Sequence, residues 1–143
     1  MLSKKQAKLF FLGGTAIFFL IFVGMTVDTL VNHVPRQTHA ENITQQVRMG
    51  RHLWDANNCM GCHTIMGEGA YYAPELTKVY ERRGADYIKA VFNFPGGWRP
   101  HGRHMVEYNF TEEEKDALVA FFKWVDEADL NGFPPKPSLS LDR

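Results

Sequence analysis

The feature that most constrains this chain is a stretch near the N-terminus that carries no charge. Residues 9–27 read LFFLGGTAIFFLIFVGMTV. As an α-helix these 19 residues extend about 28 Å, which is close to the thickness of the hydrocarbon core of a bilayer. We therefore expect one transmembrane helix, surrounded by membrane lipid. The alternative is a cleaved signal peptide with Thr38-His39-Ala40 as its cleavage site, although the apolar part of a signal is usually only about 7 to 15 residues long.

The charges around this stretch predict its orientation. Three lysines precede it and Asp28 follows it, and positively charged flanks stay on the cytoplasmic side of a membrane. The N-terminus is therefore expected in the cytoplasm, and everything after about residue 32 on the other side. Three glycines within the stretch either let another helix approach closely or reflect how common glycine is in membrane helices: Gly13, Gly14 and Gly24. The lysines are Lys4, Lys5 and Lys8.

The remainder of the chain has room for one modest folded domain. Lysine plus arginine and aspartate plus glutamate balance at 16 each, so charge gives no reason to expect a nucleic acid as a partner. The polar segment after the apolar stretch carries Pro35 and is typical of a connector. We expect four parts: a cytoplasmic N-terminus with the transmembrane helix (1–32), a connector (33–43), a folded domain (44–130) and a proline-containing C-terminal tail (131–143).

The pattern of apolar residues predicts helices in the folded domain and no strands. Helical spacing favours segments at about 44–57, 76–82, 86–92 and 111–128. The last begins with a capping box, because Glu114 follows Thr111 after three residues. Glycine, proline and tyrosine make most of 64–84 and of 93–104 irregular. The fold class is therefore all-α, with a single N-terminal transmembrane helix before a helical domain.

The only two cysteines define a cofactor motif. Cys59 and Cys62 are followed directly by His63, which gives C-x-x-C-H. At this spacing two thiols can add to the two vinyl groups of a haem while the histidine reaches the iron. A zinc site would need a fourth ligand from a distant histidine, and a thioredoxin-like pair would need a βαβ context. A structural disulfide would leave His63 without a role. We predict one covalent haem c with His63 as an axial ligand.

The iron needs a sixth ligand, and Met105 is the methionine best placed to supply it. It lies 42 residues after His63, in a Gly/Pro-rich segment that ends just before the last helix. His101 and His104 are the alternatives and would give a bis-histidine iron of lower potential, whereas His/Met ligation raises the potential. Otherwise these histidines face water near the haem propionates. The other methionines lie in or before the apolar stretch, on the preceding helix or too close to His63: Met1, Met25, Met49, Met60 and Met66.

Six protein and haem ligands leave the iron no vacant site, so it would pass electrons and not bind a substrate. We find no Ser/His/Asp group, carboxylate pair or phosphate-binding loop elsewhere in the sequence. The chain is therefore expected to be an electron-transfer protein without a catalytic centre of its own.

These features resemble the class I cytochromes c. Ala73-Pro74-Glu75-Leu76 is similar to the G-P-x-L segment of that family, in which the proline carbonyl accepts the proton of the proximal histidine. The resemblance implies that Pro74 orients His63 and raises its basicity. Ala73 stands where the family has glycine, which is a departure from the pattern.

The chain resembles more closely the family of cytochrome c subunits of bacterial nitric oxide reductase. The similarity lies in the single membrane helix, N-N-C-x-G-C-H at 57–63, G-E-G-A-Y-Y-A-P-E-L at 67–76 and R-R-G at 82–84. It continues in the methionine and E-Y-N-F-T-E-E-E of 105–114 and in the tail. C-x-x-C-H alone is common to many proteins, whereas the ten-residue run at 67–76 is specific.

The resemblance implies a partner and a location. In that family a large membrane subunit holds a low-spin haem b and a high-spin haem beside non-haem iron, where two nitric oxide molecules are reduced to nitrous oxide. Electrons come from a periplasmic cytochrome c or a small copper protein. This chain would then lie in the bacterial inner membrane with its haem domain in the periplasm. The resemblance also implies that Gly69 and Tyr71 contribute to a calcium site at the subunit interface; otherwise Gly69 gives backbone freedom to a haem-wrapping loop and Tyr71 packs on the haem.

Two other functions are compatible with the same motifs. One is a free-standing, membrane-anchored shuttle to a terminal oxidase, which the short connector disfavours because it limits reach. The other is a haem-based gas sensor in which nitric oxide displaces Met105, although no output domain follows.

Overall fold

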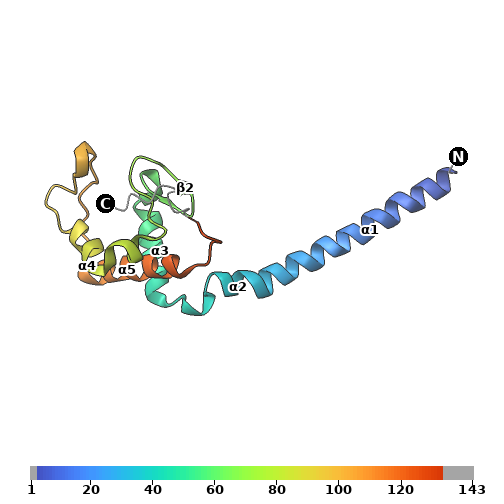
Figure 1. Cartoon of the computed structure of the whole chain (residues 1–143), viewed down its shortest axis with the longest axis horizontal. Helices are drawn as coiled ribbons and strands as arrows, with labels where there is room; N and C mark the ends of the chain where they lie inside the picture. Colours follow the sequence, from blue (N-terminus) through green and yellow to red (C-terminus); the bar gives the residue numbers. More distant parts are fainter. Residues whose placement is uncertain (1–2, 134–143) are drawn as a thin grey trace, which may run out of the picture. The chain divides into compact units, whose positions relative to one another are not determined.

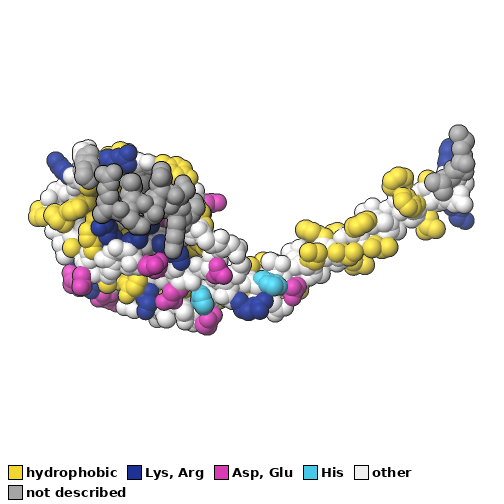
Figure 2. All heavy atoms as spheres, viewed as in Figure 1, with side chains coloured by type: hydrophobic (Ala, Val, Ile, Leu, Met, Phe, Trp, Pro, Cys, Tyr) yellow, Lys and Arg dark blue, Asp and Glu magenta, His cyan; other side chains and the backbone are white. Residues whose placement is uncertain are grey.

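The N-terminal part of the molecule is a long helix without protein packing. The computed structural model describes residues 3–133, with only the backbone of His101, and divides the chain between Arg36 and Gln37. Helix α1 (Lys4–Asp28) begins with a capping box between Ser3 and Gln6, and none of its residues is buried. Figure 2 shows hydrophobic side chains along it. Among the described residues this is the one helix long and apolar enough to cross a membrane, as the sequence predicted.

Helical structure continues past the apolar stretch into the segment that we expected to be a connector. Helix α1 is followed by a π-helical turn η1 (Thr29–His33) and by α2 (Val34–Gln37). In the π turn the Val34 N–H donates to the Thr29 carbonyl, five residues earlier. A proline ring clashes with the carbonyl four residues before it in a regular α-helix. The wider π turn lets the helix continue past Pro35. The polar, proline-containing segment therefore widens the helix locally and does not end it.

Three helices form the core of the second unit (Figure 1). They are α3 (Gln45–Ala56), α4 (Val79–Phe92) and α5 (Glu112–Glu127). Helices α3 and α5 approach closely at Gly50, because a Cβ there would overlap the Ala117 carbonyl. Trp54 of α3 packs edge-on against Phe122 of α5 with ring centroids 5.7 Å apart. This apolar contact is the platform on which the attachment motif sits, and its core is Val47, Trp54, Val79, Ile88, Leu118, Phe121, Phe122 and Val125.

The helix ends follow the sequence signals. Helix α5 begins after Thr111, whose side chain accepts from the Glu114 N–H while Glu114 accepts from the Thr111 N–H; the predicted capping box is confirmed. The two short helices predicted at 76–82 and 86–92 are both parts of α4. Gly84 separates them, with φ 75° and ψ 170°, a conformation that only glycine adopts without strain.

The connecting segments contain short elements that the sequence did not predict. Strands β1 (Thr64–Ile65) and β2 (Glu68–Gly69) form an antiparallel hairpin, and two residues are too few to show an alternating pattern. Single 3-10 turns occur at η2 (Ala40–Asn42), η3 (Cys59–Gly61) and η4 (Pro100–Gly102). Helices remain the dominant structure, in agreement with the predicted all-α class. Residues 134–143 of the predicted tail lie outside the described part.

Candidate functional site

The attachment loop, residues 57–63, is a tight turn at the end of α3. Asn58 takes a left-handed conformation with φ 50°, and η3 follows at once. The N–H groups of Cys62 and His63 donate to the Cys59 carbonyl over 3.1 and 2.9 Å. Cys59 is half-buried against the core, Cys62 is exposed and both thiols are free. The turn therefore holds the two sulfurs and the imidazole at one end of the helical core.

The environment of Cys59 does not suit redox or zinc chemistry. Burial raises the pKa of the Cys59 thiol to about 11, although its hydrogen bond with Tyr108 acts in the opposite direction. Reactive and metal-binding cysteines have lowered pKa values, because the thiolate is the nucleophile and the ligand. Within residues 3–133 no group of three or more His, Cys, Asp and Glu side chains could hold a metal ion. The raised pKa gives no support to a thioredoxin-like pair, and the described residues give none to a zinc site.

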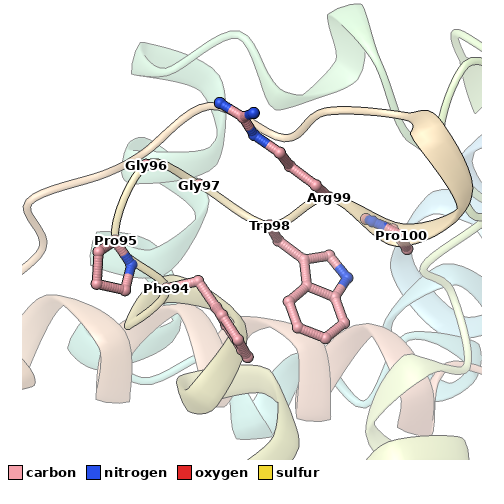
Figure 3. A pocket seen from close by; sticks show the side chains of 7 residues that line it. All are labelled: Phe94, Pro95, Gly96, Gly97, Trp98, Arg99 and Pro100. Carbon is pink, nitrogen blue, oxygen red and sulfur yellow. The ribbon is translucent and has the colours of Figure 1, made fainter.

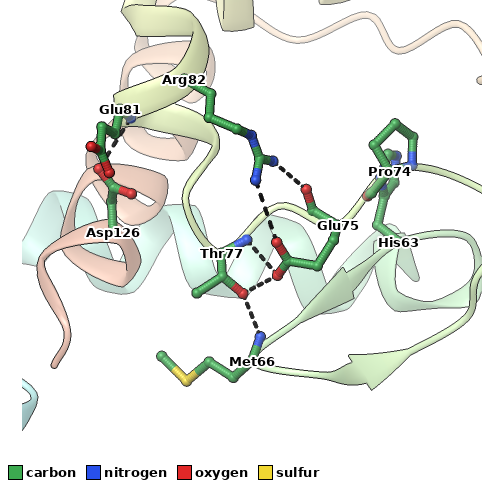
Figure 4. A network of polar contacts seen from close by, with 8 residues as sticks. All are labelled: His63, Met66, Pro74, Glu75, Thr77, Glu81, Arg82 and Asp126. Carbon is green, nitrogen blue, oxygen red and sulfur yellow. Dashed lines mark hydrogen bonds and ion pairs between the residues drawn. The ribbon is translucent and has the colours of Figure 1, made fainter. Parts of the chain in front are cut away.

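His63 is held in one tautomer by a backbone group. Its Nδ1 lies 2.8 Å from the Pro74 carbonyl (Figure 4). A carbonyl can only accept, so Nδ1 carries the proton and Nε2 keeps its lone pair when the ring is neutral. Burial lowers the pKa of His63, against the hydrogen bond to Pro74, which raises it. The neutral ring with a free Nε2 is the form that binds a metal, and the hydrogen bond fixes its orientation.

A covering segment, residues 67–76, folds over the attachment loop through backbone hydrogen bonds. The N–H of Ala70 donates to the Met60 carbonyl, that of Ala73 to Cys62 and that of Leu76 to Thr64, over 2.8 to 2.9 Å. Gly69 is required in this arrangement because its φ is 123° and a Cβ would overlap the His63 carbonyl. The specific ten-residue run of the sequence is therefore the segment that surrounds and orients His63.

A polar network fixes the end of the covering segment (Figure 4). Glu75 accepts hydrogen bonds from the N–H and the hydroxyl of Thr77, whose Oγ1 accepts from the Met66 N–H over 2.6 Å. Arg82 of α4 donates to the Glu75 carbonyl and lies 3.6 Å from its carboxylate. Thr77 is fully buried. The network ties the segment that carries Pro74 to both the hairpin and α4. Sequence reasoning gave Glu75, Thr77 and Arg82 no role, although two of them stand in the motifs that carried the resemblance.

Gly69 and Tyr71 occupy different environments. Gly69 is part of β2 and packs against backbone, whereas Tyr71 is 79% exposed and donates a long hydrogen bond of 3.4 Å to the Gly67 carbonyl. Neither residue belongs to an acidic cluster in the described part of the chain.

Met105 lies in an extended segment that is bound to the covering segment and to the attachment loop. Its side chain is half-buried. On one side, the Arg103 guanidinium donates to the Tyr72 carbonyl, and the His104 N–H to the Tyr72 hydroxyl over 3.2 Å. On the other side, Tyr108 contacts the Cys59 thiol. The fold therefore brings Met105 from a distance of 42 residues to the neighbourhood of the motif.

Of the two rival histidines, His104 has a side chain with a defined partner. The His104 Nε2 donates to the Gly96 carbonyl over 2.9 Å, so the ring is engaged with the turn before it. The side chain of His101 is outside the described part, and its backbone lies in η4. The structure therefore gives the ring of His104 a partner other than iron.

The turn that faces His104 forms an open pocket of about 580 Å³ (Figure 3). The rings of Phe94 and Trp98 lie together in it with centroids 4.2 Å apart. Its lining is mostly apolar and glycine, with one arginine: Phe94, Pro95, Gly96, Gly97, Trp98, Arg99 and Pro100.

Taken together, the donor set fits a covalently attached haem. Two free thiols flank a turn, a neutral histidine presents Nε2, and a half-buried thioether lies on a segment bound to the same loop. These groups match the attachment and axial-ligand chemistry of haem c.

Comparisons with known proteins agree with this chemistry. The family model for cytochrome c matches residues 47–126. The chain is 39% identical to the nitric oxide reductase C subunit of Halomonas halodenitrificans, over 96% of this chain and 97% of that protein. It is 36% identical to the protein of the same name from Stutzerimonas stutzeri, over 93% and 94% of the two chains. It is 39% identical to the protein of the same name from Cereibacter sphaeroides, over 94% of this chain and 95% of that protein.

Proposed function

Because the chain belongs to the family of nitric oxide reductase C subunits and carries a cytochrome c domain, it is a haem c electron-transfer subunit, and we propose that it relays electrons from periplasmic carriers to a catalytic membrane subunit. Haem c supplies the one-electron centre of this relay. The donor in this proposal is a soluble cytochrome c or a small copper protein. The observation that carries the proposal is the hydrogen bond between His63 Nδ1 and the Pro74 carbonyl, which leaves Nε2 of the C-x-x-C-H histidine free to bind iron.

Each residue of the site has a separate role in the proposal. Cys59 and Cys62 form the thioether bonds, in which each S–H adds across a vinyl group and no outside oxidant is needed. His63 and Met105 would hold the haem iron, and Pro74 keeps the proton of His63 at Nδ1. Two protein ligands leave this chain no place to bind a substrate at the iron.

The catalytic subunit in this proposal carries haem b, a high-spin haem and non-haem iron. There two nitric oxide molecules, two electrons and two protons give one nitrous oxide and one water. Because haem c accepts one electron at a time, each turnover requires two reductions of this chain. The residues of this chain hold and position the carrier, and they take no part in forming the N–N bond.

The membrane arrangement is also part of the proposal. Helix α1 spans the bacterial inner membrane in contact with lipid, with Lys4, Lys5 and Lys8 on the cytoplasmic side. The haem domain then lies in the periplasm. The division into parts at residues 32, 43 and 130 belongs to this arrangement and stays a prediction.

We propose in addition that Gly69 and Tyr71 contribute to an interface calcium site. Calcium prefers six to eight oxygen ligands, and the described part of this chain provides no cluster of acids that would complete such a set. The exposed Tyr71 and the backbone near Gly69 would therefore supply only a share, and the partner subunit the remainder.

The assembly can be tested by isolating the full-length chain from membranes dissolved in a mild detergent. We expect haem b and non-haem iron to co-purify with it in fixed ratio to haem c, and calcium to be reduced in Tyr71→Phe, which removes the hydroxyl and keeps the Ala70 N–H bond to Met60. Recovery of this chain alone, with haem c only, would contradict the subunit assignment and favour the free-standing shuttle.

A further inference from the structure

The distal loop, residues 93–110, contains the short turn η4 (Pro100–Gly102) and carries Met105 in a part that belongs to no helix or strand. From Arg103 to Phe110 the backbone belongs to no helix or strand. Such a segment has none of the cooperative hydrogen bonding that keeps a helix residue in place. The position of Met105 must therefore depend on individual contacts, and these can be named.

Four contacts join the segment around Met105 to the turn at 96–98. The Met105 N–H donates to the Trp98 carbonyl over 2.8 Å. The Gly96 N–H donates to the Glu107 carboxylate over 3.1 Å, and the His104 Nε2 donates to the Gly96 carbonyl over 2.9 Å. Gly97 has φ 82° and so little room that a Cβ would overlap the Met105 carbonyl.

His104 and Glu107 act on the same residue of the turn from two directions. His104 binds the carbonyl of Gly96 and Glu107 binds its N–H. Gly96 and Gly97 both have positive φ values and no side chains. Apart from the Gly97 N–H bond to the Phe94 carbonyl and the contact between the Phe94 and Trp98 rings, the turn is held by these bonds. The residues that grip the turn stand directly before and two positions after Met105. Together they form a clasp, which we define as His104, Glu107 and Gly96.

We propose that His104 is a positioning residue whose clasp keeps Met105 on the iron and so keeps nitric oxide off it. The inference rests on the proposed ligand role of Met105. A subunit of a nitric oxide reductase works where nitric oxide is present, and a diatomic gas can bind haem iron only at a free axial position. Release of Met105 would require the segment to move away from the turn. The clasp opposes that movement, and loss of one of its hydrogen bonds makes it easier.

The test uses the full-length, detergent-dissolved protein with haem attached. Carbon monoxide binding to the reduced protein serves as the probe, because it requires the sixth ligand to leave. We expect His104→Ala to increase the binding rate roughly five- to tenfold, the effect of one lost hydrogen bond. His104→Gln, which keeps an N–H donor, should return the rate to within about twofold of the unchanged protein. His52→Ala is the matched control, because His52 is exposed on α3.

A second readout separates positioning from general destabilisation. Hydrogen exchange of the Met105 amide, which is bonded to Trp98, should quicken in His104→Ala while the amides of α3 and α5 stay unchanged. If His104→Ala does not accumulate, Glu107→Ala and Glu107→Gln carry the same test from the other side of Gly96, with the glutamine again restoring the slow rate.

Several outcomes would overturn the proposal. One is an unchanged carbon monoxide rate in both His104→Ala and Glu107→Ala. Another is a rate increase in His104→Gln equal to that in His104→Ala. If His104 were itself the ligand, the unchanged protein would show no sulfur-to-iron charge-transfer band. Failure of the relay is distinguishable, because it would appear as absence of haem b from the purified complex while the carbon monoxide rates still responded to the clasp.

Discussion

The two segments that carry the proposed iron ligands are held by different means. His63 stands in a segment fixed by backbone hydrogen bonds from Ala70, Ala73 and Leu76 and by the carbonyl of Pro74. Met105 stands in an extended segment whose contacts depend largely on side chains, those of His104 and Glu107 above all. Backbone contacts survive most substitutions, whereas each side-chain contact can be lost by a single one. The proximal side should therefore be rigid and the distal side adjustable.

The largest expected effect is that of Gly69→Ala on the proximal side. The new Cβ would overlap the His63 carbonyl, and φ is 123°, so the change should destabilise the domain by about 3 kcal/mol or more and reduce haem attachment. The matched control is Gly84→Ala, where φ is also positive but the space is open. That change should cost only about 1 to 3 kcal/mol and leave haem attachment intact. Haem content and thermal unfolding of the purified variants check this, and equal losses in the two would contradict the account.

Met105→Leu should have the next largest effect, and only on the distal side. The thioether is lost while the volume of the side chain is nearly kept, so the free energy of unfolding should change by less than about 1.5 kcal/mol. The sulfur-to-iron charge-transfer band of the oxidised protein should disappear and the reduction potential should fall. Retention of the band in this variant would refute the ligand assignment.

Arg82→Gln tests the polar network of the proximal side. It removes the ion pair with Glu75 and weakens the bond to the Glu75 carbonyl. Because the guanidinium is substantially exposed, we expect a loss of only about 1 kcal/mol in the free energy of unfolding. A double variant, Arg82→Gln with Glu75→Gln, should recover part of it, since the carboxylate is no longer left without its partner. Denaturant unfolding measures both, and strict additivity of the two single changes would argue against a shared network.

Asp126→Asn should have the smallest effect, with a pH dependence. Asp126 accepts from the Glu81 N–H at the start of α4 over 3.1 Å. Burial raises its pKa, against the attraction of Lys78. The stability that this carboxyl contributes is therefore present below its ordinary pKa of 3.8 and is lost as pH rises through the higher folded value. Between acid and neutral pH, the free energy of unfolding of the asparagine variant should rise by less than about 1 kcal/mol relative to that of the unchanged protein. Denaturant unfolding at several pH values measures this, and a gain that shrinks with rising pH would contradict the sign.

The sequence predicted well those features that depend on local chemistry. The apolar length of residues 9–27 predicted α1, the Thr111 and Glu114 pair predicted the start of α5, and C-x-x-C-H predicted the cofactor. Each of these signals lies within a short window and has one main physical reading. Two short helices were predicted on either side of Gly84, and the structure agrees, because the non-helical backbone of Gly84 separates the two parts of α4.

The features that were missed depend on contacts between distant residues. The roles of Arg82 and Thr77 arise because α4 returns to the covering segment, and no short pattern encodes that return. His104 was weighed as a ligand because the sequence shows only its proximity to Met105; its bond to Gly96 depends on the shape of the turn. The helix continues past Pro35 because of a π turn, and a proline in a polar segment does not predict such a turn.

The central claim is that electrons enter through the haem c of this chain and then pass to the catalytic subunit. Rapid anaerobic mixing of the oxidised complex with a reduced small copper protein or cytochrome c tests it directly, with haem c and haem b followed at separate wavelengths. We predict that haem c is reduced first, that haem b follows, and that Met105→Leu alters the rates of both steps because the potential of its haem c is lower. Reduction of haem b before haem c, or at an unchanged rate when haem c is missing, would contradict the account.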